Sequence, residues 1–72
     1  MLNSYYVVAY VGNQMYRVTD DLRFRIYSSE RLYVWENRDI IDMCKILDED
    51  SSRHGYKYLI YDLNGNCVGG NK

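Results

Sequence analysis

The stretch that decides the fold begins with Arg31-Leu-Tyr-Val-Trp35, continues from Arg38 to about Glu49, and ends with Tyr56-Lys-Tyr-Leu-Ile-Tyr61. The first and last segments are rich in β-branched and aromatic residues, which predicts strands. The middle segment carries an apolar stripe at helical spacing, formed by Ile40, Ile41, Cys44 and Leu47 and flanked by Met43 and Ile46. We therefore expect a strand, a helix that begins after an Asn37 N-cap, and a second strand parallel to the first.

A second interpretation of the same region stays open. Ser28-Ser29-Glu30 could cap one long helix that runs from Glu30 to Asp50. The polar block Glu36-Asn-Arg-Asp39 argues against it, because a full turn would have no apolar side chain. We favour a strand over residues 31–35.

The N-terminal third predicts a β-hairpin. Tyr5 to Val11 and Gln14 to Thr19 are separated by Gly12-Asn13, a pair of residues that both tolerate positive φ. With a two-residue loop, Val11 lies opposite Gln14 and Ala9 opposite Tyr16. The core side would then carry Tyr5, Val7, Ala9, Val11, Tyr16 and Val18.

Leu22 to Tyr27 alternates cleanly and predicts a third strand with Leu22, Phe24 and Ile26 pointing inward. Near the other end, Asn64-Gly65 predicts a turn before a short last strand, and Gly69 to Lys72 reads as a frayed tail. The expected fold class is α+β, with an antiparallel sheet of four to five strands and one helix on one face, in the order β-β-β-β-α-β.

Length and composition predict a single domain over residues 1–72. No apolar run approaches the roughly eighteen residues of a membrane span, so no membrane partner is expected. The N-terminal segment lacks the basic and apolar regions of a signal peptide, which predicts a cytoplasmic protein. In that compartment Cys44 and Cys67 are expected to be reduced thiols.

The net charge of −1 hides an asymmetry. Residues 36–50 hold six acids against two bases, a net −4, whereas the strand segments are mildly basic. Asp48, Glu49 and Asp50 are interpreted as a solvated, fraying helix end, although acids at that end are slightly unfavourable and hint at a basic partner.

No pattern predicts catalysis, a metal or a cofactor. The glycines match no phosphate-binding loop. His54 lies beside Arg53 and Gly55 and reads as a loop residue rather than as a general base. Two cysteines and one histidine are too few ligands for a zinc site. We therefore expect a protein that is not an enzyme and needs no cofactor.

Nine tyrosines in 72 residues exceed ordinary usage, and their phase in the strands predicts a surface. A sheet with one helix leaves one face uncovered, and Tyr, Trp and Arg are the residues that dominate protein interfaces. Amphipathic tyrosines also line half-wet sheet faces without any partner. The predicted partner-binding residues are Tyr6, Tyr10, Arg17, Arg23, Arg25, Tyr27, Tyr33 and Trp35.

Two functions follow from this predicted surface. The first is a module that binds another protein, either a host factor or its own copy. The second is single-stranded nucleic-acid binding, with rings stacking on bases and arginines contacting phosphates. The charge balance disfavours the second. A third possibility is that the acidic helix imitates a phosphate backbone, although six acids are few for that role.

Tyr56-Lys-Tyr-Leu-Ile-Tyr-Asp-Leu-Asn-Gly-Asn-Cys-Val68, placed after an acidic helix, is similar to the ending of many small phage and bacterial β-α-β proteins. In size and character the chain also resembles small phage proteins that inhibit host enzymes or defence systems such as CRISPR. This resemblance implies a protein that occludes a target, and it assigns no role to any individual residue.

Overall fold

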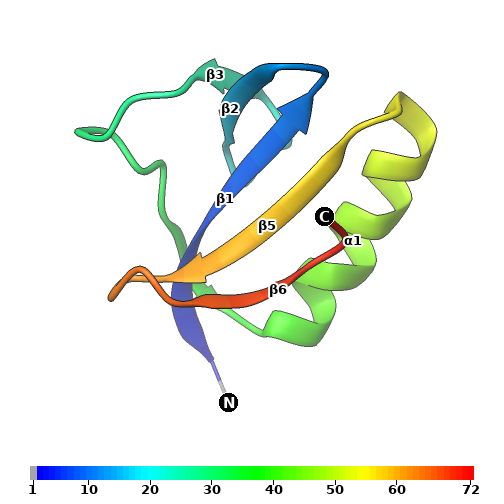
Figure 1. The fold of residues 1–72 in the computed structure, drawn as a ribbon. Helices are drawn as coiled ribbons and strands as arrows, with labels where there is room; N and C mark the ends of the chain where they lie inside the picture. The colour runs from blue at the N-terminus through cyan, green and yellow to red at the C-terminus, as the bar shows by residue number, and fades with distance from the viewer. Residues whose placement is uncertain (1) are drawn as a thin grey trace.

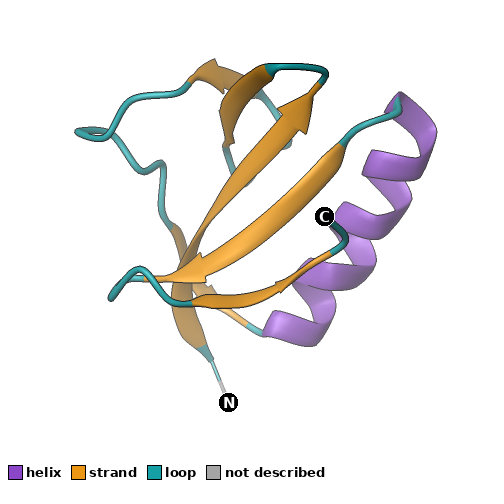
Figure 2. Ribbon diagram, in the orientation of Figure 1, coloured by secondary structure: helices purple, strands orange, loops and turns teal. Residues whose placement is uncertain are grey.

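One antiparallel sheet and one helix pack together in the computed structural model, which describes residues 2–72 (Figures 1 and 2). The predicted α+β class is confirmed, with six strands in the described part rather than four to five. In chain order the elements are β1 (Asn3–Val11), β2 (Gln14–Val18), β3 (Phe24–Ile26), β4 (Trp35–Arg38), α1 (Ile40–His54), β5 (Lys57–Asp62) and β6 (Cys67–Gly70).

β1 is the central strand of the sheet. The strand order is β3-β2-β1-β5-β6, and β4 pairs with the beginning of β1. β5 occupies one edge of β1, while β2 and β4 share its other edge, β2 beside residues 8–11 and β4 beside residues 3–5. Because β4 and β5 both run antiparallel to β1, they are parallel to each other, as the sequence predicted.

The β1–β2 hairpin is confirmed with its predicted register. Val11 pairs with Gln14 and Ala9 with Tyr16, so the loop is Gly12-Asn13, and Gly12 has φ 58°. The predicted core side is buried at Tyr5, Val7, Ala9 and Val18, with Tyr16 packed against the core. Val11 is exposed instead, because it lies at the end of the hairpin beyond the packed core.

The helix is longer than predicted. Asp39, not Asn37, is the N-cap, and its Oδ1 accepts a hydrogen bond from the Ile41 N–H at 2.8 Å. The helix continues to His54 and ends at Gly55 (φ 73°), whose N–H donates to the Ser51 carbonyl. Asp48 to Asp50 therefore lie within the last turns and are not a frayed end.

The buried stripe of α1 is rotated relative to the predicted one. Met43, Leu47 and Ser51 recur every four residues and are buried, while Ile40 and Cys44 pack at the margin of the core. Ile41 is exposed. The sequence offered too many apolar residues in this helix to fix which of them face the sheet.

The strand predicted at residues 31–35 is wrong, and so is the alternative of one long helix. Residues 31–34 are irregular, with Tyr33 at φ 57°, and β4 instead covers Trp35 and the polar residues after it. Trp35 is fully buried (0% exposed), and its Nε1–H donates to the Val18 carbonyl at 2.8 Å. This anchor places the strand after the apolar run rather than within it.

β3 is shorter than the alternation in residues 22–27 predicted. Leu22 has φ 63° in the preceding turn, and only Phe24 to Ile26 pair with β2. Phe24 packs edge-on against Tyr56, at a ring-centroid distance of 4.9 Å. Ile26, predicted to point inward, is 85% exposed. The reason is that α1 packs on β5 and β6, near the edge of the sheet that lies opposite β3.

The C-terminal segment is part of the sheet rather than a frayed tail. The predicted Asn64-Gly65 turn is confirmed, and β6 returns along β5. Asn71 then binds two elements: its Oδ1 accepts from the Tyr58 N–H at 2.8 Å, and its Nδ2 donates to the Ser51 Oγ at 3.0 Å. No helix in residues 2–72 is long and apolar enough to cross a membrane.

Candidate functional site

The sheet has one face that α1 does not cover, called here the open face. Residues directly opposite each other on neighbouring strands share a face, and the registers connect Tyr6 with Tyr61, Arg17 with Arg25, and Tyr10 with both Met15 and Lys57. The open face is therefore built by β1, β2, β3 and β5, and its members are Tyr6, Val8, Tyr10, Met15, Arg17, Arg25, Tyr27, Lys57, Leu59 and Tyr61.

A ladder of rings and one guanidinium crosses the open face from side to side. The Arg17 guanidinium carbon lies 4.3 Å from the ring centre of Tyr27 and 5.0 Å from that of Tyr6. Tyr6 in turn stacks on Tyr61, with ring centres 5.2 Å apart and planes 15° apart. Each contact is of a kind that contributes roughly 0.5–1.5 kcal/mol beyond burial.

Arg17 is the most deeply enclosed charge of this ladder. It is only 3% exposed, and its Nε and Nη2 donate to the Ser28 carbonyl at 3.2 and 3.0 Å. The sequence places Arg17 on the outward side of the strands, among the predicted partner-binding residues, and on that side it is buried rather than exposed. The side chain fastens the segment after β3 onto the sheet, so it orders the face rather than projecting from it.

The opposite end of the ladder is also closed by local contacts. Burial, and then hydrogen bonding by Tyr10, raises the pKa of Tyr61 to about 12. The Lys72 Nζ lies 4.6 Å from the ring centre of Tyr10. The Tyr6 ring is thus engaged by Arg17 of β2 and by Tyr61 of β5, the strands on either side of β1.

The structure brings together five of the eight predicted site residues, namely Tyr6, Tyr10, Arg17, Arg25 and Tyr27. Arg23 is exposed in the turn before β3, where its Nε lies 3.1 Å from Asp21 Oδ2. Tyr33 lies in the irregular segment under the Arg31 guanidinium, not on a strand. Trp35 belongs to the core and contributes nothing to the surface.

Exposed apolar side chains gather where β2 and β3 form the margin of the sheet. Ile26 is 85% exposed, Met15 40% and Tyr27 38%. Arg25, also exposed, directly precedes Ile26, which pairs with Tyr16 and so lies on the other face of the sheet from Arg25. The prediction missed Met15, which was placed on the outward side but not counted as a contact, and Ile26, whose alternation pointed inward. We call Met15, Arg25, Ile26 and Tyr27 the β3 margin.

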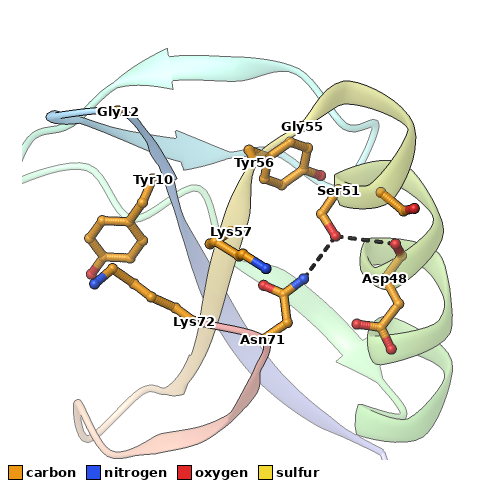
Figure 3. A pocket seen from close by; sticks show the side chains of 10 residues that line it. Tyr10, Gly12, Asp48, Ser51, Gly55, Tyr56, Lys57, Asn71 and Lys72 are labelled. Carbon is orange, nitrogen blue, oxygen red and sulfur yellow. Dashed lines mark hydrogen bonds between the residues drawn. The ribbon is translucent and has the colours of Figure 1, made fainter.

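A shallow depression of about 870 Å³ lies between the last turns of α1, the start of β5 and the C-terminal residues (Figure 3). Lys57 and Lys72 are on its sheet side and Asp48 on its helix side (Figure 3). Asn71 crosses it to Ser51, so part of the space is already bridged within the protein. No group of three or more metal-ligating side chains occurs in residues 2–72.

The acids at the end of α1 have partners within the sheet. The Tyr58 hydroxyl donates to Asp48 Oδ1 at 2.5 Å and the Tyr56 hydroxyl to Asp50 Oδ2 at 2.5 Å. His54 Nδ1 lies 3.2 Å from Asp50 Oδ1. Glu49 pairs with Arg53 at 2.9 Å, so all three acids have partners within the chain: tyrosine hydroxyl groups for Asp48 and Asp50, and basic side chains for Glu49 and Asp50. Cys44 and Cys67 are free thiols.

Comparison with known proteins finds no matching family model, no similar curated protein and no similar solved structure.

Proposed function

We propose that this chain is a non-enzymatic module that binds another protein through the β3 margin of its sheet. The observation that supports this most is the joint exposure of Met15, Arg25, Ile26 and Tyr27 at the margin where β2 meets β3, a strand that has a neighbour on one side only. An exposed isoleucine beside a ring, a thioether and a guanidinium has the composition of an interface centre. An edge strand left this apolar is otherwise a liability.

The rest of the ladder supports the same proposal by its rigidity. Arg17 holds the Tyr27 ring on one side, and its hydrogen bonds to Ser28 hold the chain that follows. A contact residue that is already ordered loses little conformational entropy when a partner binds. The open face is thus prepared to bind without rearrangement.

The way in which such a module would act is occlusion of its target. A small chain can cover a functional surface of a larger protein, as inhibitors of host enzymes and of defence complexes encoded by phages do. We propose the cytoplasm of the host cell as the place of action, with a host factor as the partner. A copy of the same chain is the alternative partner.

The test compares partner capture by the wild type and by an Arg25→Glu/Tyr27→Ala variant, with molar mass in solution measured by light scattering. The proposal expects the variant to fold, as shown by its circular dichroism, and to lose the captured protein. The matched control is Arg53→Glu/His54→Ala at the far end of α1, which should capture as the wild type does. Capture that survives the double change in the margin would rule out this face. A dimer that becomes a monomer would identify the chain itself as the partner.

Single-stranded nucleic-acid binding is the second candidate, and the ring geometry speaks against it. Base stacking needs a free ring face. Trp35 is buried, Tyr6 is engaged by Arg17 and Tyr61, and Tyr10, Tyr27 and Tyr33 each have a cation of this chain over the ring. Affinity for an oligonucleotide that falls steeply with salt would favour this candidate over protein binding.

A further inference from the structure

Two arginines lie directly opposite each other on neighbouring strands of the open face. Arg17 of β2 pairs in register with Arg25 of β3. Like charges in this arrangement repel, because cross-strand side chains on one face approach to about 5 Å at their Cβ atoms. Such a pair is unfavourable unless an anion neutralises it.

The described part of the chain supplies no such anion at close range. The ion pairs within residues 2–72 engage Arg23, Arg38, Arg53 and His54, and none includes Arg17 or Arg25. Arg17 is compensated by two rings and one carbonyl group. A buried cation without a carboxylate keeps much of its field, because little water is present to screen it.

Arg25 is among the groups that lower the pKa of Asp21, but Asp21 already has other partners. Asp21 accepts a hydrogen bond from the Thr19 hydroxyl and pairs with Arg23. The Thr19 hydrogen bond is the main cause that lowers the pKa of Asp21, and Arg25 contributes least among the causes. Arg25 therefore retains an exposed guanidinium fork beside the field of Arg17.

We propose that Arg25, with Arg17 behind it, binds a carboxylate from an acidic segment of the partner protein. The inference rests on the proposed function and specifies the partner's chemistry. A guanidinium fork matches a carboxylate in two parallel hydrogen bonds. Met15, exposed on the same face two residues before Arg17, lies next to the pair, so the segment presents an acidic residue next to an apolar one.

A protein carboxylate fits this site better than a nucleic-acid backbone. The site offers one accessible fork, whereas a phosphate backbone needs a row of cations. The Tyr6 ring is also engaged within the chain, by Arg17 and Tyr61.

The test is an NMR titration that follows the side-chain Nε–H signals of Arg17 and Arg25. The probe is a blocked Leu-Glu-Glu-Leu peptide, and its matched control is Leu-Gln-Gln-Leu. We expect the glutamate peptide to shift the Arg25 signal, the glutamine peptide to leave it in place, and Arg25→Gln to weaken binding by about fivefold. Arg53→Gln, whose arginine is also exposed, should bind the peptide as the wild type does.

Several outcomes would overturn the inference. Equal shifts with both peptides, or binding unchanged by Arg25→Gln, would remove the carboxylate site. An oligothymidylate that shifts the Arg25 signal at lower concentration than the peptide would assign the site to phosphate instead. A shift that depends on protein concentration without peptide would assign it to a second copy.

Failure of this inference can be told apart from failure of the proposed function. If Arg25→Gln leaves partner capture intact while Tyr27→Ala abolishes it, the binding face stands and the carboxylate site falls. If neither change affects capture, the binding face itself is wrong.

Discussion

Tyr56 and Tyr58 each place a hydroxyl group of the sheet against a carboxylate of α1, and so join the two layers by charge-assisted hydrogen bonds. Burial first, and then the bond to Asp50 or Asp48, raises the pKa of each phenol above its ordinary value of 10.0. These two side chains make the helix end and β5 one unit. Together with the pairing of Glu49 with Arg53, they explain why three consecutive acids can occupy the last turns of a helix.

The raised pKa values predict a loss of stability in alkali. Tyrosines of the unfolded chain ionise near their ordinary pKa, whereas folded Tyr56, Tyr58 and Tyr61 keep their protons to higher pH. The unfolded state then binds fewer protons, so the free energy of unfolding is unaffected below about pH 10 and falls as the pH rises toward 12. Urea unfolding at about pH 8 and about pH 11 measures this fall.

Two variants serve as controls for that measurement. Tyr58→Phe should cost about 1 kcal/mol at neutral pH, where it removes the bond to Asp48, and should make the alkaline fall smaller. Tyr27→Phe, at an exposed ring, should leave the alkaline fall as it is. A free energy of unfolding that stays constant between the two pH values would contradict the assignment.

Trp35 gives a second prediction at this scale. Trp35→Phe removes the indole N–H that donates a hydrogen bond to the buried Val18 carbonyl, and it leaves a cavity in the core. We expect a loss of about 2–4 kcal/mol in the free energy of unfolding, measured in urea. Tyr33→Phe, two residues away and outside the core, should change it by about 0.5 kcal/mol or less. Similar losses for the two variants would mean that Trp35 is no anchor.

At the scale of elements, β6 depends on one close approach of two backbones. Gly70 has φ 141°, and a Cβ there would lie 2.9 Å from the Leu59 Cα and still nearer to the Tyr58 carbonyl. The strand can run beside β5 only because this position has no side chain. Both β6 and the Asn71 contacts that follow it therefore require a glycine at position 70.

Gly70→Ala is expected to detach the end of β6 and to cost about 2 kcal/mol or more in urea unfolding. Gly12→Ala is the matched control, since Gly12 has φ 58° and nothing within 4 Å of its would-be Cβ. That control should cost only about 1 kcal/mol. An equal cost at both positions would show that left-handed backbone strain, and not the close approach, sets the effect.

The sequence predicted those elements whose signals are local. The Gly12-Asn13 loop fixes the β1–β2 register, and the Asn64-Gly65 turn fixes the return to β6. The start of β4 and the end of α1 depend on distant partners instead: Trp35 on the Val18 carbonyl, and Asp48 on the Tyr58 hydroxyl. The sequence analysis misplaced the start of β4 and the end of α1 because no residue nearby in the chain indicates these long-range contacts.

The same distinction applies to the open face. Strand phase correctly gathered Tyr6, Tyr10, Arg25 and Tyr27 on one side. The alternation of residues along a strand does not indicate which side chain of a face a later segment will cover. Arg17 is such a case, because it is bound by the Ser28 carbonyl of the segment after β3. Nor can it tell how far one helix reaches across a sheet, which is why exposed Ile26 was assigned to the core.

At the scale of the whole molecule, stability should decrease from the middle of the sheet to its margins. β1 and β5 are paired along both edges over much of their length, while β3 has one neighbour and three residues. In amide hydrogen exchange, the amides of Val7 and Ile60 should therefore exchange only through global unfolding, whereas that of Ile26 should exchange through local fluctuations. Uniform protection across the sheet would contradict this gradient.

The central place of β1 has a consequence for synthesis on the ribosome. Its pairing with β5 joins positions as far apart as Tyr5 and Asp62. Until β5 has been synthesised, one edge of β1 has no strand to pair with. The apolar face of the β1–β2 hairpin also has no complete core to pack against. Long-range closures of this kind slow folding. We therefore expect a nascent chain of this protein to fold cooperatively only after its C-terminal strands have been synthesised.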